Sequence, residues 1–244
     1  MASAPSEAQS YATRLVRVDE GVVFPFYGRG SANAAVLVPA FQIEATPVTN
    51  AQFLAFVRST PRWQRGRVAR LFADERYLAH WAGPETLGAA ARPNQPVTHV
   101  SWFAARAYCS SLGRRLPSEH EWELVAQADA TRRDASRDPA FVAQILEWYS
   151  QPRGVLADVG QRPANRYGAH DMHGLVWEWV LDFNAVMVDA DNRQGGDAAS
   201  SQFCGGGSVA ARDSADYAAF MRYAFRSSLQ AAYTVPNLGF RCAQ

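Results

Sequence analysis

Two acids, two histidines and two tryptophans crowd into residues 167–179, a density of functional side chains that is unusual for a loop. Two glycines bracket a tight connection that brings backbone carbonyls close to Asp171 and Glu178. Calcium is held in proteins by carboxylates together with carbonyls of this kind. The same stretch also suits a core strand, because Trp177 and Trp179 alternate with Glu178 and would place both indoles on one side. A calcium loop and a tryptophan-rich core strand are therefore the two interpretations.

Four other side chains offer ligands for a redox metal. His170 and His173 carry imidazoles, which suit iron and copper, and Cys204 and Met221 carry the soft sulfur that copper prefers. A buried free cysteine or an exposed histidine is the more ordinary role for residues of these types. A copper or iron site is therefore less favoured than these ordinary roles.

The cysteines bear on both redox chemistry and compartment. Cys109, Cys204 and Cys242 allow at most one disulfide and leave one thiol over, with the pairing open, and their spacing matches no zinc pattern. Residues 1–5 lack the basic start and apolar stretch of a secretory signal, yet resemble the small-residue tail left after cleavage of one. We expect a periplasmic or secreted protein if a signal has been removed, and a cytoplasmic one otherwise.

The composition excludes several classes of function. Twenty-four basic residues stand against 23 acidic ones, so the net charge of +1 gives no reason to expect nucleic acid or an anionic membrane as partner. Every basic residue is arginine, and without lysine there can be no Schiff base, pyridoxal phosphate attachment or phosphate-loop lysine. No run of about eighteen apolar residues exists, so no membrane-spanning helix is expected.

Short strands and helices must position these residues. Residues 14–26 and 35–43 are rich in β-branched side chains and predict an antiparallel hairpin, with Gly21 as a turn. Thr49 and Gln52 have the spacing of a capping box, which predicts the start of an amphipathic helix.

Three more helices are predicted downstream. Ser101 caps a helix over residues 102–112, where Cys109 lies on the buried side as a small hydrophobe. Ser118 opens a second capping box, and residues 140–149 are amphipathic.

The last forty residues predict three strands, at 203–208, 220–228 and 236–242. No repeat period and no linker divides the chain. We expect a single α+β domain over residues 14–244, preceded by a flexible N-terminal segment at 1–13.

Six blocks of sequence, in order, span nearly the whole chain and carry a family resemblance. They include Thr-Pro-Val-Thr-Asn, Arg-Leu-Pro-Ser-Glu, Trp-Glu-Trp and Asn-Leu-Gly-Phe-Arg-Cys, and they lie at residues 46–53, 96–102, 107–109, 115–123, 177–179 and 237–242. Together they resemble the formylglycine-generating enzyme family, also called the sulfatase-modifying factor domain. The resemblance implies one compact α+β domain of C-type-lectin-like fold with much irregular structure.

The resemblance also sharpens the metal predictions. Members that make formylglycine bind copper through a cysteine pair just after a Gly-Gly-Ser segment, but no cysteine lies between Cys204 and Cys242 here. Because a copper(I) site needs soft sulfur ligands, we expect that this chain does not make formylglycine. The family's calcium loop implies four ligands in this sequence: Asp171, Gly174, Val176 and Glu178.

Within the family, the Met-His-Gly-Leu-Val-Trp-Glu-Trp and Cys-Gly-Gly-Gly segments resemble bacterial accessory proteins, including those beside copper nitrite reductase and one in pyoverdine maturation. The resemblance places four residues around the peptide groove of formylglycine synthases: Trp177, Ser208, Arg226 and Asn237. Three functions stay open: an accessory or maturation protein acting on a peptide or metalloenzyme partner, a non-catalytic C-type-lectin-like binding module of the immunity type, and a divergent metal-dependent oxidase.

Overall fold

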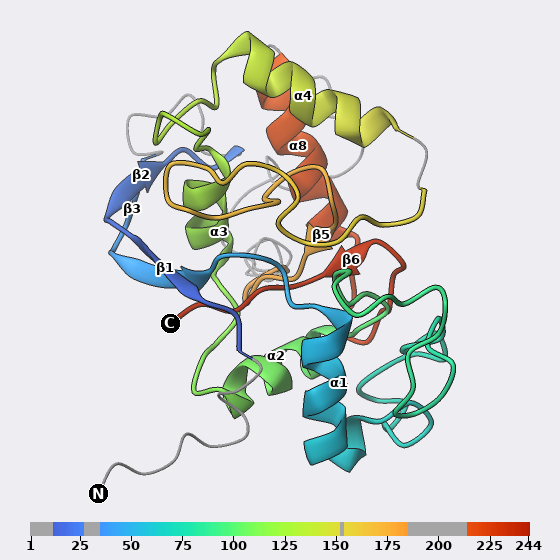
Figure 1. Ribbon diagram of the computed structural model, residues 1–244. Coiled ribbons are helices and arrows are strands. Elements are labelled where there is room, and N and C mark those ends of the chain that lie inside the picture. Colours follow the sequence, from blue (N-terminus) through green and yellow to red (C-terminus); the bar gives the residue numbers. More distant parts are fainter. Residues whose placement is uncertain (1–11, 27–34, 152–153, 185–213) are drawn as a thin grey trace, which may run out of the picture.

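The computed structural model describes residues 12–26, 35–151, 154–184 and 214–244 (Figure 1). The strand predicted at 203–208 lies outside these ranges, and so do Cys204 and Ser208. Across the described ranges, none of the helices combines the length and apolar character that crossing a membrane requires.

The N-terminal strands pair as predicted but are interrupted. Strand β1 (Leu15–Val18) pairs antiparallel with β4 (Phe41–Glu44), and β2 (Gly21–Val23) pairs antiparallel with β3 (Val36–Val38). Gly21 is not the predicted turn, because it is the first residue of β2. A Cβ at Gly21 would lie 2.6 Å from Cδ1 of Leu124, so a larger residue there would have to displace the Leu124 side chain of α3.

The predicted caps begin the helices. Helix α1 (Asn50–Ser59) starts at the capping box of Thr49, and the short 3-10 turn η3 (Pro61–Trp63) follows it. Helix α2 (Trp102–Ser111) is capped by Ser101. Helix α3 (Glu119–Ala126) starts at the capping box of Ser118, and α4 (Pro139–Ser150) at the side chain of Asp138.

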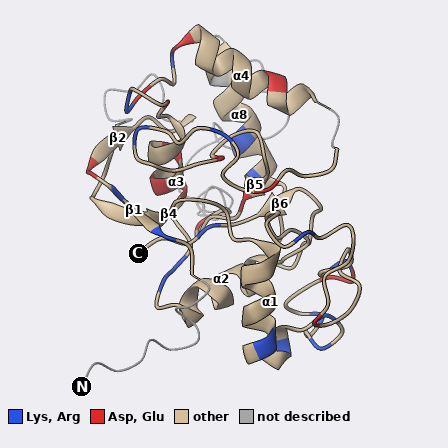
Figure 2. Cartoon of the chain, viewed as in Figure 1, with Lys and Arg blue, Asp and Glu red and all other residues tan. Residues whose placement is uncertain are grey.

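Residues 220–228 are not a strand as predicted, because they form most of α8 (Ser214–Ser227). The aromatic run there reads equally well at helical spacing, where Arg222 and Arg226 share one face. That face meets carboxylates of α3, and Figure 2 shows acidic positions on α3 and arginines on α8. Helix α4 packs against α8 on another side.

The C-terminal segment passes through the core. Strand β5 (Trp177–Glu178) pairs in parallel with β6 (Leu238–Gly239). Residues 240–243 are fully buried, and Cys242 forms a disulfide with Cys109 of α2. Cys109 is therefore buried as predicted but is not a free small hydrophobe. The main core is aromatic, with Phe53 against Tyr108 and Phe240.

Candidate functional site

The loop before β5 is built around two buried acids. Asp171 has a left-handed backbone, with φ of 57°, and its carboxylate accepts a hydrogen bond from the Gly160 N–H. Burial raises the pKa of Asp171, and the nearby charge of Glu178 adds to the rise. Glu178 accepts two hydrogen bonds of 2.8 Å from the buried guanidinium of Arg241 and a third, also of 2.8 Å, from the Trp122 indole N–H.

The loop carbonyls divide into two groups. The carbonyl of His170 accepts from Arg241, and that of His173 accepts from Arg162. Within the described residues, no hydrogen bond is donated to the carbonyl of Gly174 or of Val176. The two carboxylates and these two carbonyls would offer calcium the oxygen ligands that it prefers, with Arg241 already bonded to both oxygens of Glu178.

Trp177 of β5 and Trp179, which follows it, both pack against the main core, as the core-strand interpretation expects, but they have different surroundings. Trp179 is fully buried and donates its indole N–H to the Val100 carbonyl at 2.9 Å. Trp177 is half-buried and stacks on Phe225 of α8, with 4.5 Å between ring centroids, and on Tyr149 of α4 at 5.1 Å.

Two of the predicted groove residues lie together. The Trp177 N–H donates to the Asn237 carbonyl at 2.9 Å, and the side-chain oxygen of Asn237 is buried without a partner in the described part of the chain. Arg226 is buried instead, with Nη1 2.8 Å from Glu123 and its guanidinium over the Trp122 ring. The fourth groove residue lies outside the described ranges.

The two predicted histidine ligands of a redox metal bind different backbone carbonyls. His170 has Nδ1 2.8 Å from the Arg162 carbonyl, whereas His173 has Nε2 2.8 Å from the Ala126 carbonyl. Met221 lies half-buried on α8. Among the described residues, no three histidines, cysteines or acids gather in a metal-binding group.

A charge cluster between α3 and α8 was not predicted from the sequence. Glu123 is bonded by Arg222, at 2.7 Å, and by Arg226, while Glu119 is 3.1 Å from Arg226. Burial acts to raise the pKa of Glu123, but the two guanidiniums outweigh it and hold that pKa well below its usual range. The signal in the sequence was the four-residue spacing of the acids and of the arginines, each on one helix face.

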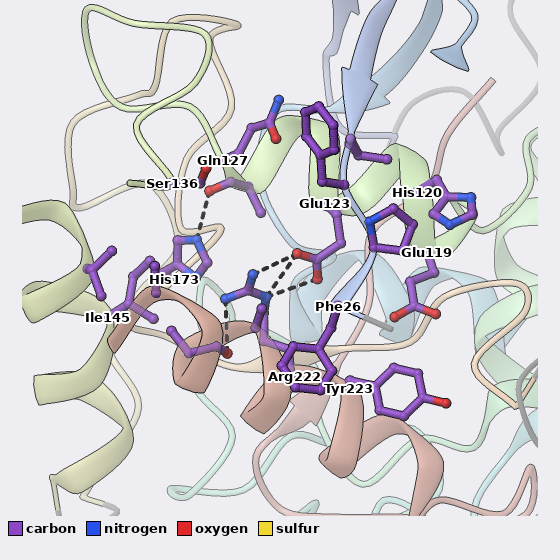
Figure 3. A pocket seen from close by; sticks show the side chains of 18 of the residues that line it. Phe26, Glu119, His120, Glu123, Gln127, Ser136, Ile145, His173, Arg222 and Tyr223 are labelled. Carbon is purple, nitrogen blue, oxygen red and sulfur yellow. Dashed lines mark hydrogen bonds and ion pairs between the residues drawn. The ribbon is translucent and has the colours of Figure 1, made fainter. Parts of the chain in front are cut away.

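A cavity of about 140 Å³ lies beside this cluster, between α3, α4, α8 and residues 23–26 (Figure 3). Glu119, Glu123, Arg222 and Tyr223 line it, together with His173. The imidazole of His173 lies edge-on to the rings of Trp122 and Phe141, and burial lowers its pKa to about 4. At neutral pH this part of the cavity wall therefore presents the uncharged imidazole of His173 beside a buried network of ion pairs.

Comparison with known proteins identifies one family over nearly the whole chain. The family of the sulfatase-modifying factor enzyme 1-like domain (FGE-sulfatase) matches residues 3–244. The formylglycine-generating enzyme of Streptomyces coelicolor is 33% identical over 91% of this chain and 83% of its own length. The protein named inactive C-alpha-formylglycine-generating enzyme 2, from Mus musculus, is 30% identical over 63% of this chain and 61% of its own length.

Among solved structures, PvdO from Pseudomonas aeruginosa is similar with a TM-score of 0.50 and 17% identity. The match covers 96% of this chain and 94% of PvdO. At this identity the likeness concerns the fold alone. It agrees with the single α+β domain with much irregular structure that we expected.

Proposed function

Because this chain belongs to the sulfatase-modifying factor enzyme 1-like family, we propose that it is a formylglycine-generating-enzyme-like accessory or maturation protein that does not make formylglycine itself. The observation that carries the proposal is the disulfide between Cys109 and Cys242. It leaves Cys204 as the one thiol of the chain. A copper site of two cysteine thiolates therefore does not fit these residues.

The proposed partner is a peptide segment, free or on a metalloenzyme, bound at Trp177 and Asn237. The amide oxygen of Asn237, which has no partner among the described residues, supports this assignment, because a buried acceptor gains most from a hydrogen bond such as a peptide N–H supplies. The partly exposed ring of Trp177 offers an apolar contact beside it. Arg226 would act indirectly, by anchoring the helix on which Phe225 stacks against Trp177, and Ser208 belongs to the same proposed groove.

We propose calcium as the resident metal, held by Asp171, Gly174, Val176 and Glu178. The two buried acids support it, and so do the two carbonyls, which receive no hydrogen bond from the described part of the chain. With oxygen ligands, the ion would supply no redox chemistry and would fix the loop that carries Trp177. The disulfide, which persists in oxidising compartments, supports an exported location.

A non-catalytic binding module is the second candidate, and the relative named inactive favours it. A binding module would release its partner chemically unchanged, whereas a maturation enzyme would modify the partner. A divergent copper or iron oxidase, using His170, His173, Cys204 and Met221, is the third.

Peptide mass spectrometry and metal analysis test the proposal. A Cys-X-Pro-X-Arg peptide incubated with the purified chain, copper(I) and oxygen should keep its mass, while the Streptomyces coelicolor relative serves as the comparison enzyme. Formation of the aldehyde product would overturn the proposal. We expect calcium in the purified protein; stoichiometric copper or iron together with oxygen uptake would establish the oxidase instead.

A further inference from the structure

The cavity beside the charge cluster is large enough for a small molecule. Its volume is about 140 Å³, and cavities of roughly 150 Å³ in other proteins hold a benzene-sized ligand. Close-packed interiors contain few voids larger than a water molecule, so a space of this size is a feature to be explained.

Aromatic rings make up much of the wall. Phe24, Phe26 and Tyr223 line the cavity with Phe141 of α4, and Figure 3 shows Phe26, Tyr223 and Glu119 among the side chains of the wall. The faces of aromatic rings carry partial negative charge and attract organic cations. The remaining wall is largely aliphatic, with Val142, Ile145 and three alanines of α8, so it suits an apolar body.

The charge of the wall also favours a cation. Two carboxylates, Glu119 and Glu123, line the cavity against one guanidinium, that of Arg222. Arg222 is already neutralised, because its Nε and Nη2 both contact Glu123 at 2.7 to 3.0 Å. Arg226, which is not part of the lining, pairs with both Glu119 and Glu123, and the nearby charge of Asp182 raises the pKa of Glu119. Three carboxylates thus stand against two guanidiniums when the histidines are neutral.

That surplus lies around Glu119, which shares Arg226 with Glu123. Oε1 of Glu119 receives a single arginine contact, from Arg226 at 3.1 Å, and within the described residues no donor reaches Oε2. Burial raises the pKa of Glu119, while the charges of Glu123 and Asp182 add to the rise and those of Arg226 and His120 oppose it. A half-buried carboxylate with acidic neighbours and one arginine that it shares with Glu123 gains from a further positive charge.

We propose that this cavity binds a small organic monocation, a protonated amine whose ammonium pairs with Glu119 and whose apolar body lies between Phe26, Tyr223 and Phe141. A carboxylate ligand would meet the surplus negative charge of the wall. A neutral ligand would leave Glu119 as it is. The site adjoins the proposed groove through Arg226, which pairs with Glu119, and the proposed calcium loop through His173, but it does not depend on either assignment.

Three probes of nearly equal shape test the charge of the ligand. Benzylamine, benzyl alcohol and benzoate are titrated into the full chain at pH 7.5 by calorimetry, with thermal shift as a second readout. We expect benzylamine to bind at least about tenfold more tightly than benzyl alcohol, and benzoate not to bind. Equal affinity for the alcohol, tighter binding of benzoate, or binding of none of the probes would overturn the proposal.

Two variants locate the site. Glu119→Gln should abolish the preference for the amine over the alcohol, because it removes the charge and keeps the shape. Ala218→Leu should fill the cavity and abolish binding of both probes in a folded protein. Glu147→Gln, on the exposed side of α4 and outside the cavity, is the matched control and should bind as the parent chain does. A preference that survives Glu119→Gln would place the amine elsewhere.

The amine has two possible sources, a free metabolite or a lysine side chain of a partner. N-acetyl-lysine methylamide distinguishes them when it competes with benzylamine. If N-acetyl-lysine methylamide competes with an affinity within about tenfold of that of benzylamine, the source is a lysine. If it does not compete, the source is a free amine. Either result agrees with a monocation site.

Discussion

At the scale of single residues, Glu178 shows how one carboxylate serves packing and chemistry together. It is buried, and its partner Arg241 is fully buried as well. If either partner were removed, the other charge would stay buried without water or an opposite charge to stabilise it. Any calcium ligation by Glu178 therefore has to share the carboxylate with Arg241, whose side chain also fixes the His170 carbonyl.

Breaking this pair should cost much stability. We expect Glu178→Gln to lower the free energy of unfolding by about 3 to 5 kcal/mol, because an uncompensated guanidinium stays buried. Urea denaturation measures it. Arg70→Gln is the control, since Arg70 and Glu75 form an exposed pair whose loss should cost less than about 1 kcal/mol. A similar small cost at Glu178 would show that water reaches Arg241.

His173 should make the protein sensitive to acid. Its pKa is about 4 in the folded chain against an ordinary value of 6.5, so the unfolded chain takes up the proton first as the pH falls. Stability linked to His173 is then complete above pH 6.5 and is lost between 6.5 and about 4. In that pH window, the slope of the unfolding free energy against pH should be smaller in His173→Phe than in the parent chain. An unchanged slope would contradict the assignment of this acid sensitivity to His173.

At the scale of elements, the loop from residue 160 to β5 is held by side chains more than by backbone pairing. Asp171 bonds Gly160, and Arg162 bonds the His173 carbonyl. Such a loop has few ways to compensate for a lost ion. Its stability is therefore the best reporter of calcium.

Removal of calcium should lower the melting temperature. A chelator should destabilise the parent chain, and addition of calcium in excess should reverse the effect. Asp171→Asn should weaken this response, because asparagine keeps the left-handed backbone and one ligand oxygen but removes the charge. If the parent chain melts at the same temperature with and without chelator, the loop is a core element without a metal.

At the scale of the whole molecule, the C-terminus closes the fold. The Gln42 and Gln244 backbones exchange two hydrogen bonds, and Ala243 exchanges two with Arg115. The disulfide joins the same terminal segment to α2 across a sequence separation of 133 residues. One covalent link thus connects the end of the chain to its middle.

Loss of this link should destabilise the folded state by about 2 to 4 kcal/mol, chiefly because the unfolded chain gains freedom. The double variant Cys109→Ala with Cys242→Ala, measured by urea denaturation, tests this expectation. Cys204→Ala is the control and should change stability little. If the control is as damaging as the double variant, Cys204 takes part in a pairing that the described residues do not contain.

The local features of the sequence were sufficient for the helix starts. Thr49, Ser101 and Ser118 cap helices as predicted, because a cap depends on a side chain and backbone N–H groups only three residues away. The antiparallel pairing of the N-terminal strands also followed from their pattern. The six blocks of family sequence led to the right fold.

The features decided by tertiary structure all involve distant partners. The run at 220–228 suits a strand locally, and the helix depends on Arg222 and Arg226 meeting Glu123 about a hundred residues earlier. The cavity results from the meeting of three helices and a strand end. The choice of Cys242 as partner for Cys109 likewise needs the fold to bring them together. Sequence specifies interactions across a few residues; the free energy of distant ones depends on burial, which exists only once the chain has folded.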